Sequence, residues 1–504
     1  MADASSGGLR SRQIIKESSL VEESLDGDLN LKLSYDNQFT ASPSTSSSKR
    51  KEEDEDRQKA TLSAIPGIGA SNVLVSVMGC FMLMWPIIFV VFVQFTMIYF
   101  GGSLKAAALA IQREYNAGNL WEYLYRRTPG IKLEAVVVYF LWNTLQVALY
   151  MVVPGKDGLG QPTPSGRVLK YNCNGLNCWI ITHILILASV KFGLFRGSIL
   201  YDNWLSILIL ANIAGLGLTI FAYVKALKSP SHVEDCRFSG SFFYDLFMGV
   251  EHNPRYGDFD FKLFFNGRPG ILAWTLINLT CVAKQYERYG YVSNAMVIIN
   301  LLHAIYILDF FVHEEWYLRT IDIAHDHFGF YLAWGDLVWL PFTYTLQAFY
   351  LVQHPDNLST LQASAILIIG FGGYAIFRLA NNQKDQFRKD MAEFGDAIVW
   401  GKPATYVAAV YKTHEGQIRH SPLLTSGWWG LARHFNYFGD LLGCLAYSLT
   451  CGTHNLLPWF YLIYMTILLT HRVFRDHVRC KEKYGKFWDE YCREVPYKIV
   501  PYIF

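Results

Sequence analysis

Long apolar runs separated by short polar segments dominate the chain from residue 73 onward. The stretch from Val73 to Tyr99 contains no charged residue. It exceeds the roughly 20 residues that a helix needs to cross a bilayer. The pattern therefore predicts that this stretch is a membrane-spanning helix.

Further apolar runs predict additional spans. A charge-free stretch from Leu441 to Thr470 is long enough to fold back at residues 452–455 and supply two of them. The other runs are Ala135–Val153, Cys178–Val190, Trp204–Val224, Gly270–Ala283, Ala295–Leu308, Leu337–Gln353 and Ser359–Phe377. We therefore predict an all-α polytopic membrane protein with about ten transmembrane helices.

Basic residues gather after the last apolar run. They are Arg472, Arg475, Arg479, Lys481, Lys483 and Lys486. Because cytosolic loops carry an excess of Lys and Arg, this end is predicted to face the cytosol. An even number of spans then puts the N-terminus in the cytosol too, whereas an odd number separates the two ends.

Residues 1–66 differ from the rest of the chain. They are rich in Ser and charged residues and contain only Tyr35 and Phe39 as aromatics. Such a composition cannot bury enough apolar surface to fold, which predicts a disordered tail. The remainder of the chain divides into a transmembrane region, residues 67–377, and a C-terminal region, residues 378–504, which holds the last spans.

Overall composition excludes several classes of protein. Charged residues make up 17% of the chain and hydrophobic residues 52%, which disfavours a soluble enzyme. A formal charge of +2 gives no field that would attract nucleic acid. Nine Cys without C-x-x-C spacing indicate neither a disulfide framework nor a zinc site.

A polar segment, Trp316–Trp339, contains several ionisable residues beside apolar runs. They are Arg319, Asp322, His325, Asp326, His327 and Asp336. Two interpretations stay open: an interfacial loop whose charges satisfy one another, or the polar end of a pocket for a mostly apolar ligand. The two His do not form the repeated clusters that a membrane di-iron site needs, so no metal is predicted.

Residues Gly370–Ala375 read Gly-Phe-Gly-Gly-Tyr-Ala, which matches the letters of a dinucleotide fingerprint. That fingerprint works only at a turn from a strand into a helix. Here it lies inside an apolar run. Small residues that let two helices approach closely are the better interpretation.

Three basic or mixed polar clusters follow in the C-terminal region. Lys384 and Arg388 are four residues apart and share one helical face, where they meet either a phosphate or lipid headgroups. Residues 426–440 bring together indoles, a guanidinium, an imidazole, an amide and a phenol. With Arg472, Arg475 and Arg479, these clusters favour a polyanionic cofactor with a planar ring.

Several motifs in this order resemble the sterol reductase family, and the resemblance covers the chain from about residue 70. They are Gly240–Arg255, Asp260–Gly270, Thr320–Gly329, Gly427–Gly430, Arg433–Tyr437 and Val495–Tyr497. The match is best to the branch that reduces the 7,8 double bond of 5,7-diene sterols. The resemblance implies an oxidoreductase of sterol and cholesterol biosynthesis in the endoplasmic reticulum membrane, with NADPH as cofactor, a sterol substrate and contacts with membrane lipid.

The resemblance also implies which residues contact NADPH. They are Lys384, Arg388, Leu424, Trp429, Asn436, Tyr437, Asp476, Cys480, Lys481, Glu482, Lys483, Tyr484 and Tyr491. Lys384 and Arg388 are expected to bind phosphate, and Trp429, Asn436 and Tyr437 to contact the rings and ribose. Asp476 and Tyr491 are expected to orient the cofactor, in a pocket that faces the cytosol at the C-terminal end of the chain.

Reduction of an unactivated alkene needs a positioned acid, because protonation precedes or accompanies hydride addition. Asp476 and Tyr491 near the cofactor compete for this role with His325, Asp326 and Glu314 near the expected sterol end. The sequence leaves the choice open.

Four alternatives compete with this function. A sterol 14-reductase of the same family differs in which double bond meets the cofactor, and a scaffold like the lamin B receptor would need a folded domain before its spans. A transporter would show inverted repeats. A methyltransferase using S-adenosylmethionine would not depend on Lys384 and Arg388.

A second sterol enzyme in the same membrane stays open as a partner.

Overall fold

The computed structural model describes residues 71–412 and 418–504, so the predicted tail, residues 1–66, lies outside the described residues. Within the described part, six helices are long and apolar enough to cross a membrane. These six are α3 (Ser71–Phe100), α6 (Leu133–Val152), α9 (Trp204–Lys228), α13 (Asn294–Val312), α19 (Thr360–Glu393) and α22 (Phe460–Tyr484). The protein is therefore a multi-pass membrane protein, as its hydropathy predicts.

Shorter helices and turns connect or flank these six. They are α4 (Leu104–Asn116), α5 (Leu120–Arg127), α7 (Gly175–Lys191), α8 (Ile199–Asp202), η1 (Val233–Asp235), α10 (Phe242–Met248), α11 (Phe261–Gly267), η2 (Arg268–Leu272), α12 (Ala273–Tyr289), α14 (Glu314–Tyr317), α15 (Ile321–Ala324), α16 (Phe330–Trp334), η3 (Gly335–Trp339), α17 (Leu340–Thr343), α18 (Leu346–Gln353), α20 (Trp428–Leu431), α21 (Phe435–Leu449), η4 (Leu457–Trp459) and α23 (Lys486–Glu494). Of the predicted spans, α7, α12, α21 and the segment 337–353 fall outside the six, so the total of about ten stays a prediction.

The strands of the described residues form four short antiparallel pairs, which the all-α prediction did not include. They are β1 (Lys156–Leu159) with β2 (Lys170–Cys173), β3 (Arg255–Tyr256) with β4 (Phe259–Asp260), β5 (Ile398–Val399) with β6 (Lys402–Pro403), and β7 (Tyr406–Lys412) with β8 (Ile418–Leu424). Strand β7 is favoured locally because Val407 and Ala409 face the interior while their neighbours are exposed.

The predicted span Leu337–Gln353 is not one helix. It begins with a π-helical turn, continues as α17, whose first turn contains Pro341, and restarts as α18 after a turn at Tyr344 and Thr345. The Thr345 hydroxyl donates to the Pro341 carbonyl at 2.7 Å, which satisfies a backbone group freed by the break. Broken backbone is tolerated at membrane depth where protein buries it, and most of this segment is buried.

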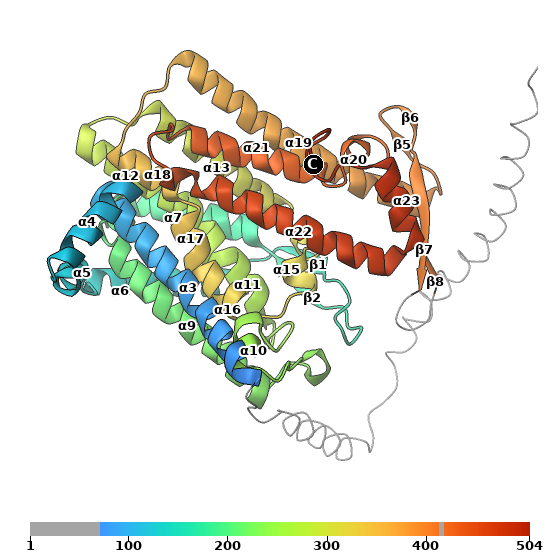
Figure 1. Ribbon diagram of the computed structural model, residues 1–504, viewed down its shortest axis with the longest axis horizontal. Helices are drawn as coiled ribbons and strands as arrows, with labels where there is room; N and C mark the ends of the chain where they lie inside the picture. Colours follow the sequence, from blue (N-terminus) through green and yellow to red (C-terminus); the bar gives the residue numbers. More distant parts are fainter. Residues whose placement is uncertain (1–70, 413–417) are drawn as a thin grey trace, which may run out of the picture. The chain divides into compact units, whose positions relative to one another are not determined.

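Helix α19 is longer than predicted. The apolar run ends at Phe377, but the helix continues to Glu393 through good helix formers without Gly or Pro. A capping box between Ser359 and Gln362 fixes its start. Figure 1 shows α19 beside α21, which in turn packs against α22, with β7, β8 and α23 at one end of these helices and α4 and α5 at the opposite end.

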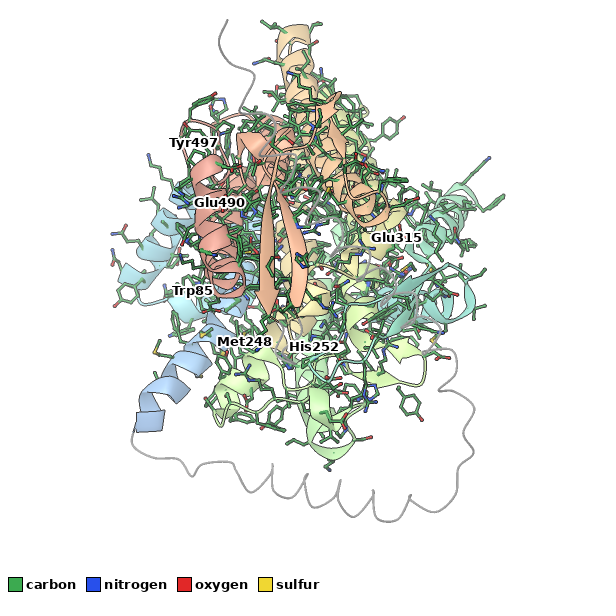
Figure 2. The ribbon with its side chains drawn as sticks, turned by 90° about the vertical axis from the view of Figure 1, so that its right-hand side faces the viewer. Trp85, Met248, His252, Glu315, Glu490 and Tyr497 are labelled. Atoms are coloured by element: carbon green, nitrogen blue, oxygen red, sulfur yellow. The ribbon has the colours of Figure 1, made fainter. Side chains whose placement is uncertain are left out.

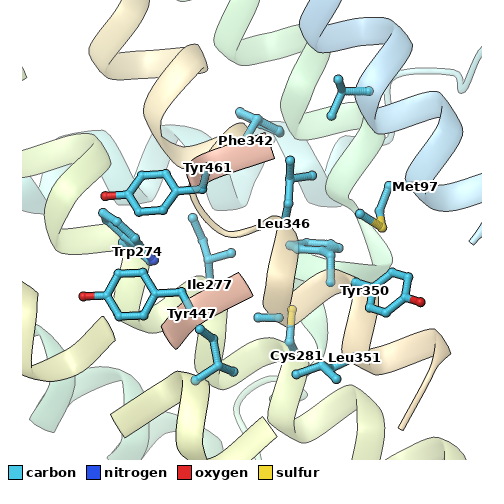
Figure 3. Packing of buried hydrophobic residues seen from close by; sticks show 14 of the residues in the cluster. Met97, Trp274, Ile277, Cys281, Phe342, Leu346, Tyr350, Leu351, Tyr447 and Tyr461 are labelled. Carbon is cyan, nitrogen blue, oxygen red and sulfur yellow. The ribbon is translucent and has the colours of Figure 1, made fainter. Parts of the chain in front are cut away.

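The fold-back predicted within residues 441–470 is confirmed, since α21 ends at Leu449 and α22 begins at Phe460. The returning helices enclose an aromatic core. The ring of Trp274 lies 6.0 Å from that of Tyr461, which in turn lies 6.0 Å from the ring of Tyr447 (Figure 3). Aromatic burial of this kind supplies much of the packing between α12, α21 and α22.

Small residues bring α19 and α21 close together, as the Gly370–Ala375 motif predicted. A Cβ atom on Gly373 would lie 2.7 Å from the Gly439 carbonyl oxygen and 2.8 Å from the Gly443 nitrogen. No side chain fits at that separation, so the glycines set the distance between the two helices. The dinucleotide-like letters therefore serve helix packing.

Candidate active site

Most of the residues that the resemblance assigns to the cofactor meet at one end of the C-terminal helices. Lys384 and Arg388 lie on α19, and Trp429 lies on α20. Asn436 and Tyr437 begin α21, Asp476 and Cys480 lie on α22, and Tyr491 lies on α23. Figure 2 looks onto this end, where the β7–β8 hairpin stands in front of the helix ends beside α23, which carries Glu490. We call Lys384, Trp429, His434, Asn436 and Asp476 the helix-end cluster.

Trp429 forms a fixed wall of this cluster. Its indole Nε1 donates to the Ala380 carbonyl oxygen at 2.7 Å, and the side chain is buried with Leu424 and Phe387. The ammonium of Lys384 lies 3.9 Å from the centre of the Trp429 ring, in a cation–π contact. Arg388, one turn further along α19, is exposed. Lys384 therefore borders an indole whose orientation is fixed by a hydrogen bond.

Asn436 presents an unused acceptor to the same place. Its side-chain nitrogen donates to the Asn381 Oδ1 at 3.1 Å. Its own Oδ1 is buried and has no hydrogen-bond partner among residues 71–412 and 418–504. A buried amide oxygen without a donor is costly, which favours a ligand that brings an N–H group.

Asp476 lies at the centre of the cluster. Its carboxylate accepts from Arg479 at 2.6 Å, and the His434 Nε2 lies 3.6 Å away. Burial lowers the pKa of His434 to about 4 even though the Asp476 charge opposes this shift. The imidazole is therefore neutral at pH 7 and stacks on the ring of Tyr437 at 5.1 Å.

The run Cys480–Tyr484 splits into two faces. Cys480 and Tyr484 pack on the cluster that buries Tyr491, whose pKa is raised by this burial. The side chains that point to solvent are Lys481, Glu482 and Lys483. Lys481 pairs with Asp489, and the Lys483 ammonium lies 4.2 Å from the ring centre of Tyr411. Cys480 and Tyr484 thus pack inward beside Tyr491, whereas the other three residues of the run are available to solvent.

The three arginines that favoured a polyanion all contact carboxylates of the chain. The nitrogen–oxygen distances are 3.1 Å for Arg472 with Asp322, 3.9 Å for Arg475 with Asp326 and 2.6 Å for Arg479 with Asp476. Within the Trp316–Trp339 segment, two carboxylates thus serve ion pairs to α22. Asp336 of the same segment has a buried oxygen without a hydrogen-bond partner in residues 71–412 and 418–504, so both interpretations of the segment stay open.

Of the acids proposed for the sterol end, Glu314 is the most firmly held. One carboxylate oxygen lies 2.5 Å from Arg268 Nη1, and the other accepts from the Gly175 backbone N–H at 2.7 Å. Arg268 is 0% and Glu314 2% exposed. A carboxylate paired in this way has both oxygens occupied, so the geometry argues against a role as proton donor. His325 is exposed, and Asp326 is half-buried.

A small cavity of about 20 Å³ lies between α13, α19 and α21. Its lining includes Leu302, Tyr306, Gly370, Tyr374, Asp440 and Tyr447. Tyr306 and Asp440 were not assigned a role from the sequence. A signal existed for Asp440, since it is an ionisable residue directly before a charge-free stretch. The sequence carried no such signal for Tyr306, because a tyrosine within an apolar run is interpreted as a packed core residue.

Helix α21 carries both the cofactor candidates and part of this cavity. Asn436 and Asp440 are four residues apart, about one helical turn or about 6 Å along the axis. The cluster and the cavity therefore adjoin.

Among the described residues, 71–412 and 418–504, no three His, Cys, Asp or Glu side chains gather as metal ligands would.

Comparison with known proteins places the chain among sterol enzymes. Residues 67–504 match the model of the family described as Ergosterol biosynthesis ERG4/ERG24. The chain is 51% identical to the 7-dehydrocholesterol reductase of Danio rerio over 77% of this chain and 84% of that protein. It is 51% identical to the enzyme of that name from Xenopus laevis over 76% and 83%.

A more distant relative is the Delta(14)-sterol reductase of Dictyostelium discoideum, with 38% identity over 88% of this chain and 94% of that protein. The family model covers more than half of this chain, and the alignments with the relatives cover most of the length of each relative. The chain therefore belongs to the Ergosterol biosynthesis ERG4/ERG24 family.

Proposed function

We propose that this protein reduces the 7,8 double bond of 5,7-diene sterols with NADPH, as a step of sterol biosynthesis. The identity of 51% to two proteins named 7-dehydrocholesterol reductase supports the choice of bond. The observation that carries the proposal is the adjacency on α21, where a polar cluster suited to a nucleotide adjoins a cavity lined mainly by apolar and aromatic side chains.

The helix-end cluster fits the cofactor by the chemistry of its donors and acceptors. Lys384 and Arg388 would bind phosphate groups, and the Trp429 indole offers a flat face for a ring. The partnerless Oδ1 of Asn436 would accept an N–H of the carboxamide. When bound, NADPH supplies the hydride.

The proton has to come from a group that reaches the cavity. Tyr306 and Asp440 line it, whereas Glu314 is occupied by Arg268 and Gly175. Asp476 and Tyr491 lie at the cluster, so they are better placed to orient the cofactor. We assign the delivery of the proton to the Tyr306 and Asp440 pair, in a site from which packed helices exclude water.

The proposal includes a location. The multi-pass chain lies in the endoplasmic reticulum membrane, and both termini face the cytosol. The candidate spans within residues 71–412 and 418–504 are even in number, which favours two ends on one side, and basic residues between 472 and 486 crowd the end of α22.

The test is sterol profiling in cells that lack both 7- and 14-reductase activity, with and without this protein. Loss of 5,7-diene sterols with unchanged 14-ene sterols is the expected result. The reverse pattern would assign the protein to 14-reduction. NADPH dependence is then measured in isolated membranes, where NADH in place of NADPH should support much slower turnover.

A further inference from the structure

Three polar side chains form a network beside the cavity between α13, α19 and α21, and Tyr374 is the one of the three that lines it. The Tyr374 hydroxyl, which lines the cavity, donates to the Asp309 Oδ1 at 2.9 Å. The other carboxylate oxygen of Asp309 is bound by the Arg378 guanidinium. Asp309 lies on α13, and its two partners lie one turn apart on α19. The network thus joins two of the three helices that enclose the cavity.

This network is buried in a place where charge is costly. Asp309 is 7% and Arg378 13% exposed, and both belong to candidate membrane-spanning helices. Ionisable groups at such positions commonly face a functional cavity. The pairing with Asp309 satisfies only part of the guanidinium, because Nε and Nη1 of Arg378 are buried without a hydrogen-bond partner in residues 71–412 and 418–504. An acceptor brought by a ligand would satisfy them.

The position of the network along the helices fits a ligand with one polar end. Asp309 lies three residues from the end of α13, and Leu302, deeper in the cavity, lies seven residues earlier. At 1.5 Å per residue this is about 10 Å along the helix. Beyond the network, Leu302 and Tyr447 offer apolar and aromatic surface. A sterol has this polarity, with a single hydroxyl on a rigid apolar body.

We propose that Tyr374, Asp309 and Arg378 bind the 3-hydroxyl of the sterol and thereby position its ring system. This assignment rests on the proposed function, because it names how that substrate is held. The hydroxyl oxygen accepts an N–H from Arg378, and its proton is donated to Asp309 or to the Tyr374 oxygen. Fixing this end of the rigid ring system determines which double bond lies beside Asp440, so the three are positioning residues.

The experiment compares two substrates in membranes that contain the full chain. One is a 3β-hydroxy 5,7-diene sterol and the other is its 3-deoxy analogue. For the wild-type protein we expect kcat/KM to favour the hydroxy sterol by on the order of 10- to 100-fold, since a hydrogen bond to a charged group is lost with the analogue.

Tyr374→Phe keeps the ring and removes the hydroxyl. We expect this variant to raise the KM for the hydroxy sterol roughly 5- to 10-fold, to leave the KM for NADPH unchanged and to lose much of the preference over the 3-deoxy analogue. Asp309→Asn should reduce the preference further. Tyr289→Phe is the matched control, since its hydroxyl donates to the Gln353 carbonyl at 3.4 Å and does not line the cavity.

The outcomes separate this assignment from the proposed function. If the wild-type protein reduces both substrates equally well, the assignment is overturned while sterol reduction stands. If Tyr374→Phe and Asp309→Asn keep the full preference, the network has a structural role only, and the assignment is again overturned. If the wild-type protein reduces neither substrate, the proposed function fails and this assignment falls with it. Should Asp309→Asn not fold, Tyr374→Phe decides.

Discussion

The buried ion pair of Arg268 and Glu314 and the helix-end cluster use the same kinds of side chains in different ways. In the ion pair, Asn174 and Gly175 occupy further hydrogen-bonding groups, at 2.8 Å from Arg268 Nη2 and 2.7 Å from Glu314. In the cluster, Lys384 faces an indole and the Asn436 Oδ1 has no partner in the described part of the chain. In the ion pair only Arg268 Nε lacks a partner among the described residues, so the pair serves mainly the fold, whereas the spare hydrogen-bonding capacity of the cluster makes it the candidate for binding a ligand.

The largest expected effect is on the buried pair. Glu314→Gln leaves the Arg268 guanidinium buried without its counter-charge, which should lower the free energy of unfolding by about 3–5 kcal/mol. Thermal unfolding in detergent measures the loss. Glu315→Gln, at the exposed neighbouring position, is the control and should unfold like the wild type. Equal stability of both variants would contradict the role given to the pair.

A smaller but more specific effect is expected at the helix-end cluster. Lys384→Ala with Arg388→Ala should raise the KM for NADPH roughly 10- to 100-fold, because two phosphate contacts are lost, and should change the KM for the sterol little. Lys389→Ala serves as the control, since Lys389 is exposed and pairs with Asp385 at 2.8 Å. An unchanged NADPH requirement in the double variant would remove both residues from the site.

The neutral imidazole of His434 predicts a dependence of stability on pH. Its pKa of about 4 lies below the value of about 6.5 in an unfolded chain. Between these values the unfolded state binds a proton that the folded state does not, so stability falls as the pH decreases from 6.5 toward 4. From pH 6.5 to pH 5 the loss should be about 1–2 kcal/mol.

Thermal unfolding of the wild-type protein and His434→Gln across this range measures the effect. The variant should lose less stability than the wild type over the same interval. Identical pH profiles would show that the imidazole is protonated, or is released, in the folded protein.

The smallest effect is expected from the N-terminal tail. Deletion of residues 1–60 should leave specific activity in membranes near that of the wild type, because their composition provides little apolar surface to pack. Activity per inserted protein is the measurement. A loss of activity at normal expression would show that the tail takes part in function.

Much of the fold follows from hydropathy, and its failures have physical causes. The spans that became α3, α6 and α9 were predicted within a few residues, since an uncharged run has few alternatives in a bilayer. The break between α17 and α18 was missed because a buried interior segment is as apolar as a lipid-facing helix. The apolar run of α19 ends at Phe377, and the shared helical face of Lys384 and Arg388 predicted helix beyond it; hydropathy alone did not show that the two parts form one continuous helix.

The candidate site was less accessible to sequence reasoning. Lys384 was singled out by its spacing from Arg388, but its assignment to the cofactor, like that of Asp476, came from the resemblance. The pairing of Arg472 with Asp322, 150 positions apart, has no local signal. The cavity is formed by helices from three separate parts of the chain. Tyr306 and Asp440 became candidate site residues only because the structure places both of them in the lining of this cavity. Residues of this kind are identified from the packing of helices in the folded protein, because their spacing along the sequence does not reveal that they are neighbours.

Helix α19 is continuous, so it fixes the axial distance between the proposed sterol-binding residues and the proposed cofactor-binding residues. Tyr374 and Lys384 are ten residues apart on one uninterrupted helix, about 15 Å along its axis. Reacting atoms must approach to about 3–3.5 Å, so this fixed length sets how far the cofactor end lies from the sterol end. A single residue inserted between them would lengthen the helix by about 1.5 Å and rotate one end by about 100°. Such an insertion would keep the residues of both proposed binding sites. It would change the distance between the two sites and their relative orientation.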